Sequence, residues 1–189
     1  MTPQGAQKQS VIQGILRVAC GRPDGIACFG GTTQAFLASL APLLAFPIVG
    51  AVIGMFTQGV IPSLTALAMY LCALLMPAVS SFELARRWGC ADRWLRFATA
   101  FNWCEWILPL LACLLMVPIS VAVGLGVDPN LGSLVLLGCL AAYGLWLLWF
   151  LARNGLGLSS GRAVLLVIVV NASTAAAVTI PGLIAGHSA

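Results

Sequence analysis

Five long apolar stretches alternate with short polar segments along the 189-residue chain. Each contains the roughly 20 residues that an α-helix needs to cross the hydrocarbon core of a bilayer. A helix satisfies its own backbone hydrogen bonds in that solvent, so the pattern predicts an all-α fold. We expect a polytopic membrane helix bundle of five transmembrane helices, at Thr33–Phe56, Val60–Leu84, Phe97–Val123, Leu131–Leu151 and Ala163–Ile184.

The third stretch is the longest and contains two prolines, Pro109 and Pro118. A proline has no N–H group to donate, and its ring clashes with the carbonyl group four residues earlier. Sharp kinks in helices are most often found at prolines. We therefore expect the third helix to be kinked or tilted.

A segment with a different pattern, Ser10–Cys20, precedes the first stretch. Gln13 and Arg17 share one helical face and the apolar residues share the other, which predicts a short amphipathic helix on the membrane surface. We interpret it as an anchor that orients the first span; the alternative is a helix that docks a partner protein. Its apolar residues are Val11, Ile12, Ile15, Leu16 and Ala19.

The composition supports a single membrane bundle without a separate soluble domain. Hydrophobic residues make up 61% of the chain and charged residues 7%, whereas soluble domains carry about 25% charged residues. We expect a cytoplasmic tail with the amphipathic helix in residues 1–32, the five-helix bundle in residues 33–184 and a short external tail in residues 185–189. The expected partners are membrane lipid and either other integral membrane proteins or further copies of this chain.

The basic residues indicate the orientation of the bundle. All nine lie on one side of the predicted spans, and the loops on the other side contain none. Cytoplasmic loops collect Lys and Arg, so we expect a cell inner-membrane protein with a cytoplasmic N-terminus and an external C-terminus. The net charge of +4 then reflects topology and does not indicate a nucleic-acid partner. The nine are Lys8, Arg17, Arg22, Arg86, Arg87, Arg93, Arg96, Arg153 and Arg162.

Four hydrogen-bonding side chains share one depth inside the predicted spans. Glu105 lies nine residues after Arg96, and Asn171 lies nine residues after Arg162. At 1.5 Å per residue, both are about 13 Å from the cytoplasmic boundary, near the midplane. The sequence predicts an intramembrane polar cluster at this level, composed of Asn102, Glu105, Tyr143 and Asn171.

This polar cluster has two interpretations. A charged side chain at the bilayer centre costs about 2.5–3.5 kcal/mol on insertion scales, so such groups are paired, neutral or functional. We favour a structural clasp of hydrogen bonds between helices, and the alternative is a site for protons or a substrate around Glu105. Because no basic residue lies inside any span, we expect Glu105 to be protonated at neutral pH.

No residue pattern indicates an enzyme, a metal site or a cofactor. The seven cysteines are scattered, with no CxxC pair, and the single histidine, His187, lies near the C-terminus. No HExxH, GxSxG, GxGxxG or Walker sequence is present, and these are the motifs that mark zinc, acyl-transfer and nucleotide sites. We therefore expect a protein that is not an enzyme and has no cofactor.

Three segments carry a resemblance to a known family: Arg22–Phe29 (RPDGIACF), Phe101–Trp103 (FNW) and the hairpin Trp149–Arg162. With the amphipathic segment and the five spans, they resemble the small Yip1-like membrane proteins of proteobacteria. In that family an acidic residue stands where this chain has Asn171, and a neutral one stands near Glu105. The resemblance implies the five-span fold, and it would link eukaryotic relatives to membrane trafficking with small GTPases, a role that we do not transfer.

The sequence thus favours a non-enzymatic membrane protein that is a scaffold or an accessory subunit of a membrane complex. The alternative is a small transporter or channel-like protein that uses the polar cluster around Glu105. An enzyme acting on a lipid or a quinone is the least favoured of the three.

Overall fold

The computed structural model describes residues 10–186, and the side chains of residues 10–179. Within that part the chain forms seven α-helices and one short 3-10 helix, with no strand. Five helical segments are long and apolar enough to cross a membrane, so the predicted all-α membrane bundle is confirmed. The expectations for Lys8 and His187 lie outside the described residues.

The five spans follow the predicted apolar stretches and extend beyond several of them. The third span consists of two helices, α4 and α5, and the fifth is described as a span to Thr179. Helix α3 continues past its apolar part because Arg87 at its end pairs with Glu83 at 2.8 Å. The spanning helices are α2 (Thr33–Thr57), α3 (Val60–Arg87), α4 (Ala91–Cys104), α5 (Ile107–Gly124), α6 (Pro129–Gly155) and α7 (Ser160–Gly186).

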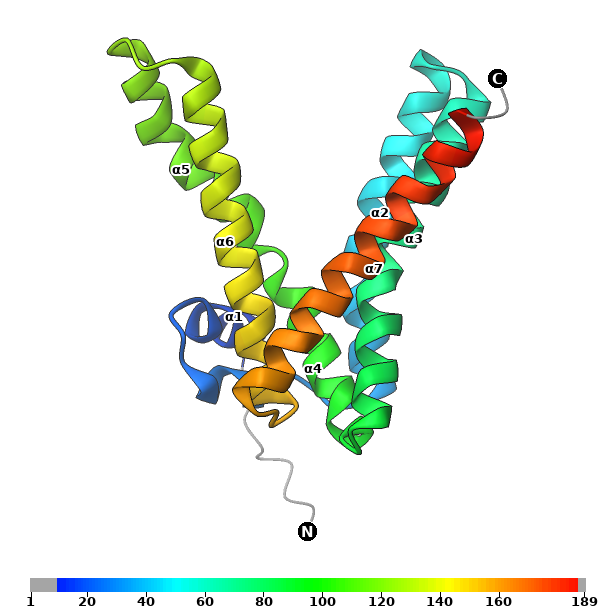
Figure 1. The fold of residues 1–189 in the computed structure, drawn as a ribbon, viewed down its shortest axis with the longest axis vertical. Helices are drawn as coiled ribbons and strands as arrows, with labels where there is room; N and C mark the ends of the chain where they lie inside the picture. Colours follow the sequence, from blue (N-terminus) through cyan, green and yellow to red (C-terminus); the bar gives the residue numbers. More distant parts are fainter. Residues whose placement is uncertain (1–9, 187–189) are drawn as a thin grey trace.

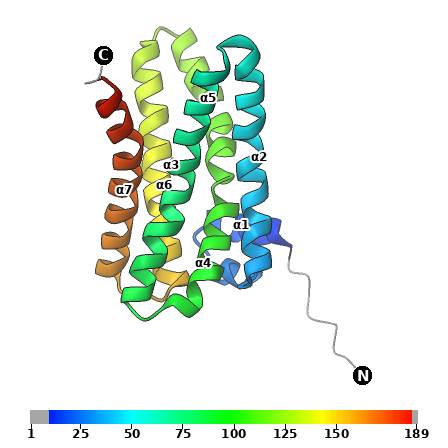
Figure 2. The same ribbon diagram turned by 90° about the vertical axis from the view of Figure 1, so that its right-hand side faces the viewer.

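The spans form two arms that meet at a common base and diverge away from it (Figure 1). One arm is the α5–α6 hairpin, and the other consists of α2, α3 and α7 (Figure 1). Figure 2 shows α7, α3 and α2 as one layer in front of α5 and α6. Helix α4 lies at the base and contacts α2, α3 and α6, so it connects the two arms.

The third span is broken at residues 105–106, between α4 and α5. Pro109 has no N–H group to donate to the Glu105 carbonyl, and its ring clashes with that carbonyl in a regular helix. The Glu105 carbonyl instead accepts the Leu108 N–H at 3.2 Å, three residues on rather than four. The predicted kink is therefore present, one turn before Pro109, whereas α5 continues through Pro118 without a break.

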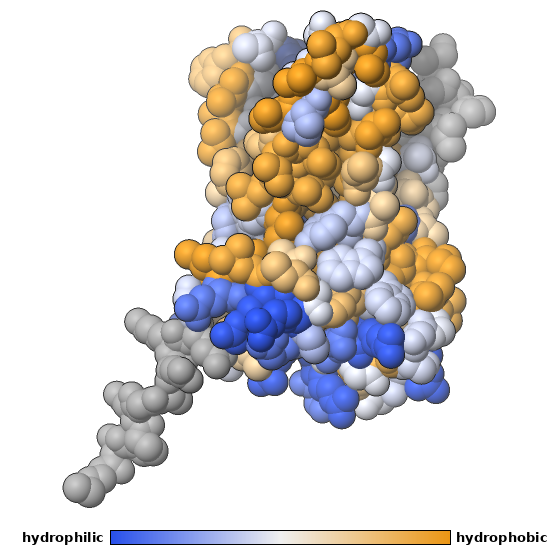
Figure 3. Space-filling view, turned by 90° about the vertical axis from the view of Figure 1, so that its left-hand side faces the viewer, coloured by the Kyte–Doolittle hydropathy of each residue, from blue (hydrophilic) through white to orange (hydrophobic). Residues whose placement is uncertain are grey.

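The buried core lies at the base, around α4. Phe97 of α4, Leu151 of α6 and Leu166 of α7 are 2% exposed or less. The arms above the base instead present apolar side chains to the outside, among them Leu114 and Leu137. Figure 3 shows this division as an apolar upper surface above a hydrophilic base. Hydrocarbon tails are as apolar as leucine, so such exposure carries no hydrophobic penalty in a bilayer.

The predicted amphipathic segment forms helix α1 (Val11–Ala19) at the base, in contact with α4. Gly14 and Val18 are buried, whereas Ile12 and Leu16 are 68% and 61% exposed. A Cβ atom at Gly14 would lie 2.9 Å from the Cβ atom of Cys28, so only glycine permits this approach. One edge of the apolar face therefore packs on the bundle, and the other edge is free to contact lipid.

The arginines lie at the base. They belong to α1, to the turn before the short 3-10 helix η1 (Pro23–Cys28), to α4, or to the ends of other helices at the base. Five of them pair locally with Asp24, Glu83 or Asp92, among them Arg17 with Asp24 at 3.3 Å and Arg86 with Glu83 at 2.8 Å. At the far end of the bundle the charged residue is Asp128, which caps α6 by accepting the Asn130 N–H at 2.8 Å.

Candidate functional site

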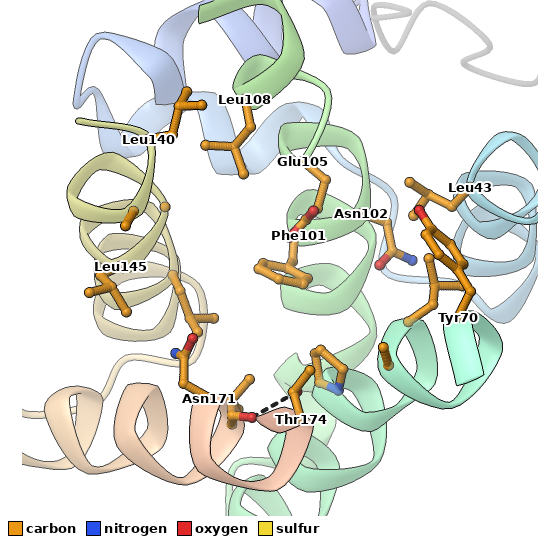
Figure 4. A pocket seen from close by; sticks show the side chains of 17 residues that line it. Leu43, Tyr70, Phe101, Asn102, Glu105, Leu108, Leu140, Leu145, Asn171 and Thr174 are labelled. Carbon is orange, nitrogen blue, oxygen red and sulfur yellow. Dashed lines mark hydrogen bonds between the residues drawn. The ribbon is translucent and has the colours of Figure 1, made fainter. Parts of the chain in front are cut away.

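A cavity of about 560 Å³ lies where the two arms meet (Figure 4). Helix α4 and both arms contribute to its walls. This volume lies within the range of about 300–1,000 Å³ that is typical of small-molecule sites. Leucines and small residues form most of the surface, and the hydrogen-bonding side chains that line it are Tyr70, Asn102, Glu105, Asn171 and Thr174.

Glu105 lines the cavity from the break between α4 and α5 (Figure 4). Among the residues that the structure describes, none forms a hydrogen bond or an ion pair with its carboxyl group. The ion pairs of the described residues lie at the base and involve Glu83, Asp24 and Asp92. The carboxyl group of Glu105 thus faces the cavity without a partner in the fold.

Asn102 lies one turn before Glu105 and connects α4 to α2. Its Nδ2 group donates to the Ser39 hydroxyl at 2.9 Å, and that hydroxyl donates to the Phe36 carbonyl at 2.6 Å. Ser39 is fully buried and Asn102 is 7% exposed. Because the Ser39 proton goes to a carbonyl, the Ser39 oxygen must accept from the amide of Asn102. The amide orientation of Asn102 is therefore determined, and its Oδ1 atom remains available.

Asn171 and Thr174 lie on one face of α7, three residues apart. Asn171 Nδ2 donates to the Val167 carbonyl at 2.8 Å, and the Thr174 hydroxyl donates to the Val170 carbonyl, also at 2.8 Å. Figure 4 shows both side chains at the cavity wall formed by α7. The Thr174 donor and one of the two Asn171 N–H groups are satisfied within α7, which leaves the second N–H of Asn171 and the oxygen acceptors of both side chains.

Tyr143 lies outside the cavity, although the sequence places it at the same depth as Glu105. Its hydroxyl donates to the carbonyl of Ala19 at 3.3 Å and so connects α6 to the end of α1. On α6 the cavity is lined instead by Leu140, Ala141, Gly144, Leu145 and Leu148. These positions recur every three or four residues and define one helical face, and Tyr143 is about 100° away from Gly144 around the helix.

The structure adds three polar residues that the sequence did not single out: Ser39, Tyr70 and Thr174. Ser39 is a small hydroxyl residue in an apolar helix, where serine usually bonds to its own backbone, so the sequence carries no signal for its second partner. Tyr70 lies on the same face of α3 as Leu74 and Pro77. The one feature of the sequence that could have indicated Tyr70 is its hydroxyl group inside an apolar span. The depth of Tyr70 in that span does not match the depth of Glu105.

The tryptophans next to Glu105 in the sequence do not line the cavity. Trp106 packs on Phe46 of α2 in a tilted arrangement, with ring centroids 5.3 Å apart, and Trp103 packs against the buried core. The aromatic side chains at the cavity wall are those of Phe101 and Tyr70. Among the described residues no group of three His, Cys, Asp or Glu side chains is placed to hold a metal ion.

No protein-family model matches the chain, and neither a curated protein nor a solved structure matches it. The resemblance to Yip1-like proteins therefore stays a prediction, and the site is interpreted from its own geometry.

Proposed function

We propose that this integral membrane protein is a small carrier, without enzymatic activity, that binds its substrate at Glu105 in the cavity between the arms. The observation that carries the proposal is the carboxyl group of Glu105, which faces an open cavity and bonds to no described residue. An ionisable group inside a membrane costs several kcal/mol and marks a functional site unless the fold pairs it. A ligand in the cavity supplies the missing partner.

The alternative interpretation, a structural clasp, requires the polar side chains to bond to one another between helices. Asn102 bonds to Ser39, and Asn171 bonds to the backbone of its own helix. Such bonds in membranes contribute only about 0.6 kcal/mol on average, and here none of them involves Glu105. A clasp therefore accounts for Asn102 but gives no reason for an acid at position 105.

The break at Glu105 supports a carrier for a second reason. Hinges in moving proteins are a few residues at the ends of helices that absorb changes in backbone angles. Helix α5 is joined to α4 through two residues outside regular helix, and Glu105 is one of them. Helix α6 also packs on α4 at the base. A ligand that bonds to Glu105 thus changes the contacts at the point from which the arm diverges. Alternating access needs such a link between ligand binding and the position of an arm.

A second candidate function, an accessory subunit, is favoured by the divergence of the arms (Figure 1). The tips of the two arms carry exposed apolar side chains such as Phe56 and Leu125, which are 87% and 83% exposed. A helix of another membrane protein would fit between such arms. Purification in a mild detergent would identify it, because an obligate partner co-purifies in fixed proportion and a carrier purifies alone or as copies of itself.

We also infer the orientation from the arginine-rich base. Lys and Arg concentrate on the cytoplasmic side of membrane proteins, so we infer that the base faces the cytoplasm and that the arms open toward the outside. In a bacterial cell this arrangement corresponds to the inner membrane. The amphipathic helix α1 then lies on the inner leaflet, with Ile12 and Leu16 toward the acyl chains.

The carrier proposal is tested by access to the cavity from each side of the membrane. In a background without the seven native cysteines, Ala141→Cys places a thiol on the cavity wall. Ala142→Cys, one residue further along α6, is the matched control outside the cavity. A membrane-impermeant maleimide is applied from either face in vesicles of known orientation.

A carrier predicts labelling of Cys at position 141 from both faces, and of the control from neither. Labelling from one face alone would contradict the carrier and favour a static binding site, as in an accessory subunit. An unlabelled thiol at position 141 would mean that water never reaches the cavity, and the proposal would then be wrong.

A further inference from the structure

We propose that the cavity binds a lipophilic amine, with the protonated amine on the Glu105 carboxylate and the apolar body between the arms. This inference rests on the proposed carrier function and specifies its substrate class. It comes from the balance of hydrogen-bond donors and acceptors at the cavity wall.

Acceptors outnumber the donors that are left on the side chains of the cavity. The Nδ2 groups of Asn102 and Asn171 bond to Ser39 and Val167, and the Thr174 hydroxyl donates to a backbone carbonyl. The amide oxygens, the Thr174 oxygen and both oxygens of Glu105 remain. The side-chain donors left among the described lining residues are the Tyr70 hydroxyl and the second N–H of each asparagine amide. A wall on which acceptors outnumber donors is complementary to a ligand that donates hydrogen bonds, and an ammonium ion donates up to three.

The charge of the cavity also favours a cationic ligand. None of the described residues that line it is basic, so an anionic ligand would have to enter beside Glu105 without any cation to offset it. A cation instead forms a charge-assisted hydrogen bond with the carboxylate, which is about twice as strong as a neutral one. The rings of Phe101 and Tyr70 offer further favourable surfaces to a cation.

The apolar walls determine the rest of the ligand. Leu108 of α5, Leu145 of α6 and Leu43 of α2 surround the polar side chains from three directions (Figure 4). A volume of about 560 Å³ exceeds what an inorganic cation needs. The leucine surface also favours an apolar body over a strongly hydrated one. These features together specify an amine attached to an aromatic or aliphatic group.

Binding of the amine exchanges one cation for another at Glu105. The carboxylate can hold either a proton or the ammonium group, and where the ammonium replaces a proton, that proton leaves to water. The titratable groups near Glu105 are the Tyr70 hydroxyl of α3, the adjacent Cys104 thiol and, on the other side of α6, the Tyr143 hydroxyl. Helices α2, α5 and α7 bring no charged side chain to the cavity. Proton and amine thus compete for one site, and the affinity for the amine falls as the medium is acidified.

The test measures binding of tritiated phenylbutylamine to the full-length protein in phosphatidylcholine nanodiscs, whose lipid has no N–H donor. Binding to empty nanodiscs is subtracted. Glu105→Gln removes the charge and keeps the shape. Glu83→Gln is the matched control, because it makes the same chemical change in a carboxyl group at the base that pairs with Arg86 and Arg87. The alcohol phenylbutanol is the neutral competitor.

We expect equal binding by the wild type and Glu83→Gln, and binding that is weaker by about tenfold or more in Glu105→Gln, the loss of one charged hydrogen bond. Glu105→Asp, which keeps the charge, should retain part of the affinity, and phenylbutanol should compete poorly. Unchanged binding by Glu105→Gln would overturn the inference. A Glu105→Gln protein that aggregates on gel filtration is replaced by Glu105→Asp, whose binding must then fall with acidification as the wild type's does.

The failure of this inference is distinguishable from the failure of the carrier proposal. Equal competition by phenylbutanol, with binding abolished by the cavity-filling change Ala141→Trp, would refute the preference for a cation and leave a ligand cavity in place. Binding of neither probe, together with an unlabelled thiol at position 141, would contradict both proposals.

Discussion

Replacing Pro109 with alanine is expected to move α5 relative to α4. The substitution restores an N–H group one turn after Glu105, so the Glu105 carbonyl regains a partner four residues ahead and loses the clash with the proline ring. A proline in a helix interior costs about 3 kcal/mol relative to alanine. The contact between Trp106 and Phe46 resists the movement, but an aromatic pair contributes only about 0.5–1.5 kcal/mol. The continuous helix should therefore prevail.

The size of the movement follows from the geometry of α5. The helix contains 18 residues, which corresponds to about 27 Å at 1.5 Å per residue. Sharp kinks exceed about 20°. Removing a kink of about 20° displaces the far end of a helix about 27 Å long by roughly 9 Å.

Pulsed electron–electron resonance between two spin labels measures this displacement. Labels at Phe56 and Leu125 lie at the tips of the two arms, where the native side chains are 87% and 83% exposed and make few contacts. The distance distribution should shift by several ångströms in Pro109→Ala. Pro118→Ala is the control, because α5 is unbroken at Pro118, and its distribution should stay close to that of the native chain. Identical distributions for Pro109→Ala and the native chain would refute proline as the cause of the break.

Three further predictions concern the topology, the bond between α2 and α4, and helix α1. Alkaline phosphatase fused after Ala189 should be active and a fusion at Cys90 inactive, because the arginine-rich side stays in the cytoplasm; activity at Cys90 would reverse the proposed orientation. Ser39→Ala should lower the free energy of unfolding by about 1–3 kcal/mol, since it leaves the buried amide of Asn102 without its acceptor; denaturant titration in detergent measures this, and an unchanged midpoint would contradict the bond. Leu16→Asp should leave the bundle folded but reduce the contact of α1 with lipid, seen as weaker quenching of a nearby fluorophore by brominated lipid, and unaltered quenching would mean that α1 lies off the membrane.

The five spans were predictable because hydropathy alone determines which segments enter lipid. The ends were less so. Helix α3 runs to Arg87 rather than Leu84, since pairing with Glu83 supports an extra turn in water. Helix α6 begins at Pro129 because Asp128 caps it. A hydropathy average over a segment does not report such local bonds, and they move the end of a helix by a few residues.

The depth of the site residues in the membrane was predictable from the sequence, but the direction in which each side chain points was not. Counting residues from an arginine placed Asn102, Glu105 and Asn171 at one level, and all three line the cavity. The same count included Tyr143, whose side chain leaves α6 on another face and reaches α1. Depth in a membrane depends on rise per residue, whereas direction depends on how helices are rotated against one another. The pattern of a nearly all-apolar helix does not encode that rotation.

Glu105 combines two features that act through one residue. Its carbonyl lies where Pro109 interrupts the third span, so the backbone there is bonded to Leu108 at 3.2 Å rather than held in a regular helix. Its carboxyl group faces the cavity at the same place. A ligand that bonds to the carboxyl group therefore acts directly on the joint between α4 and the α5–α6 arm, without a chain of intermediate contacts. A ligand can shift the equilibrium between two positions of the arm only by the difference between its affinities for them. We expect that difference to be largest for a bond made at the joint itself.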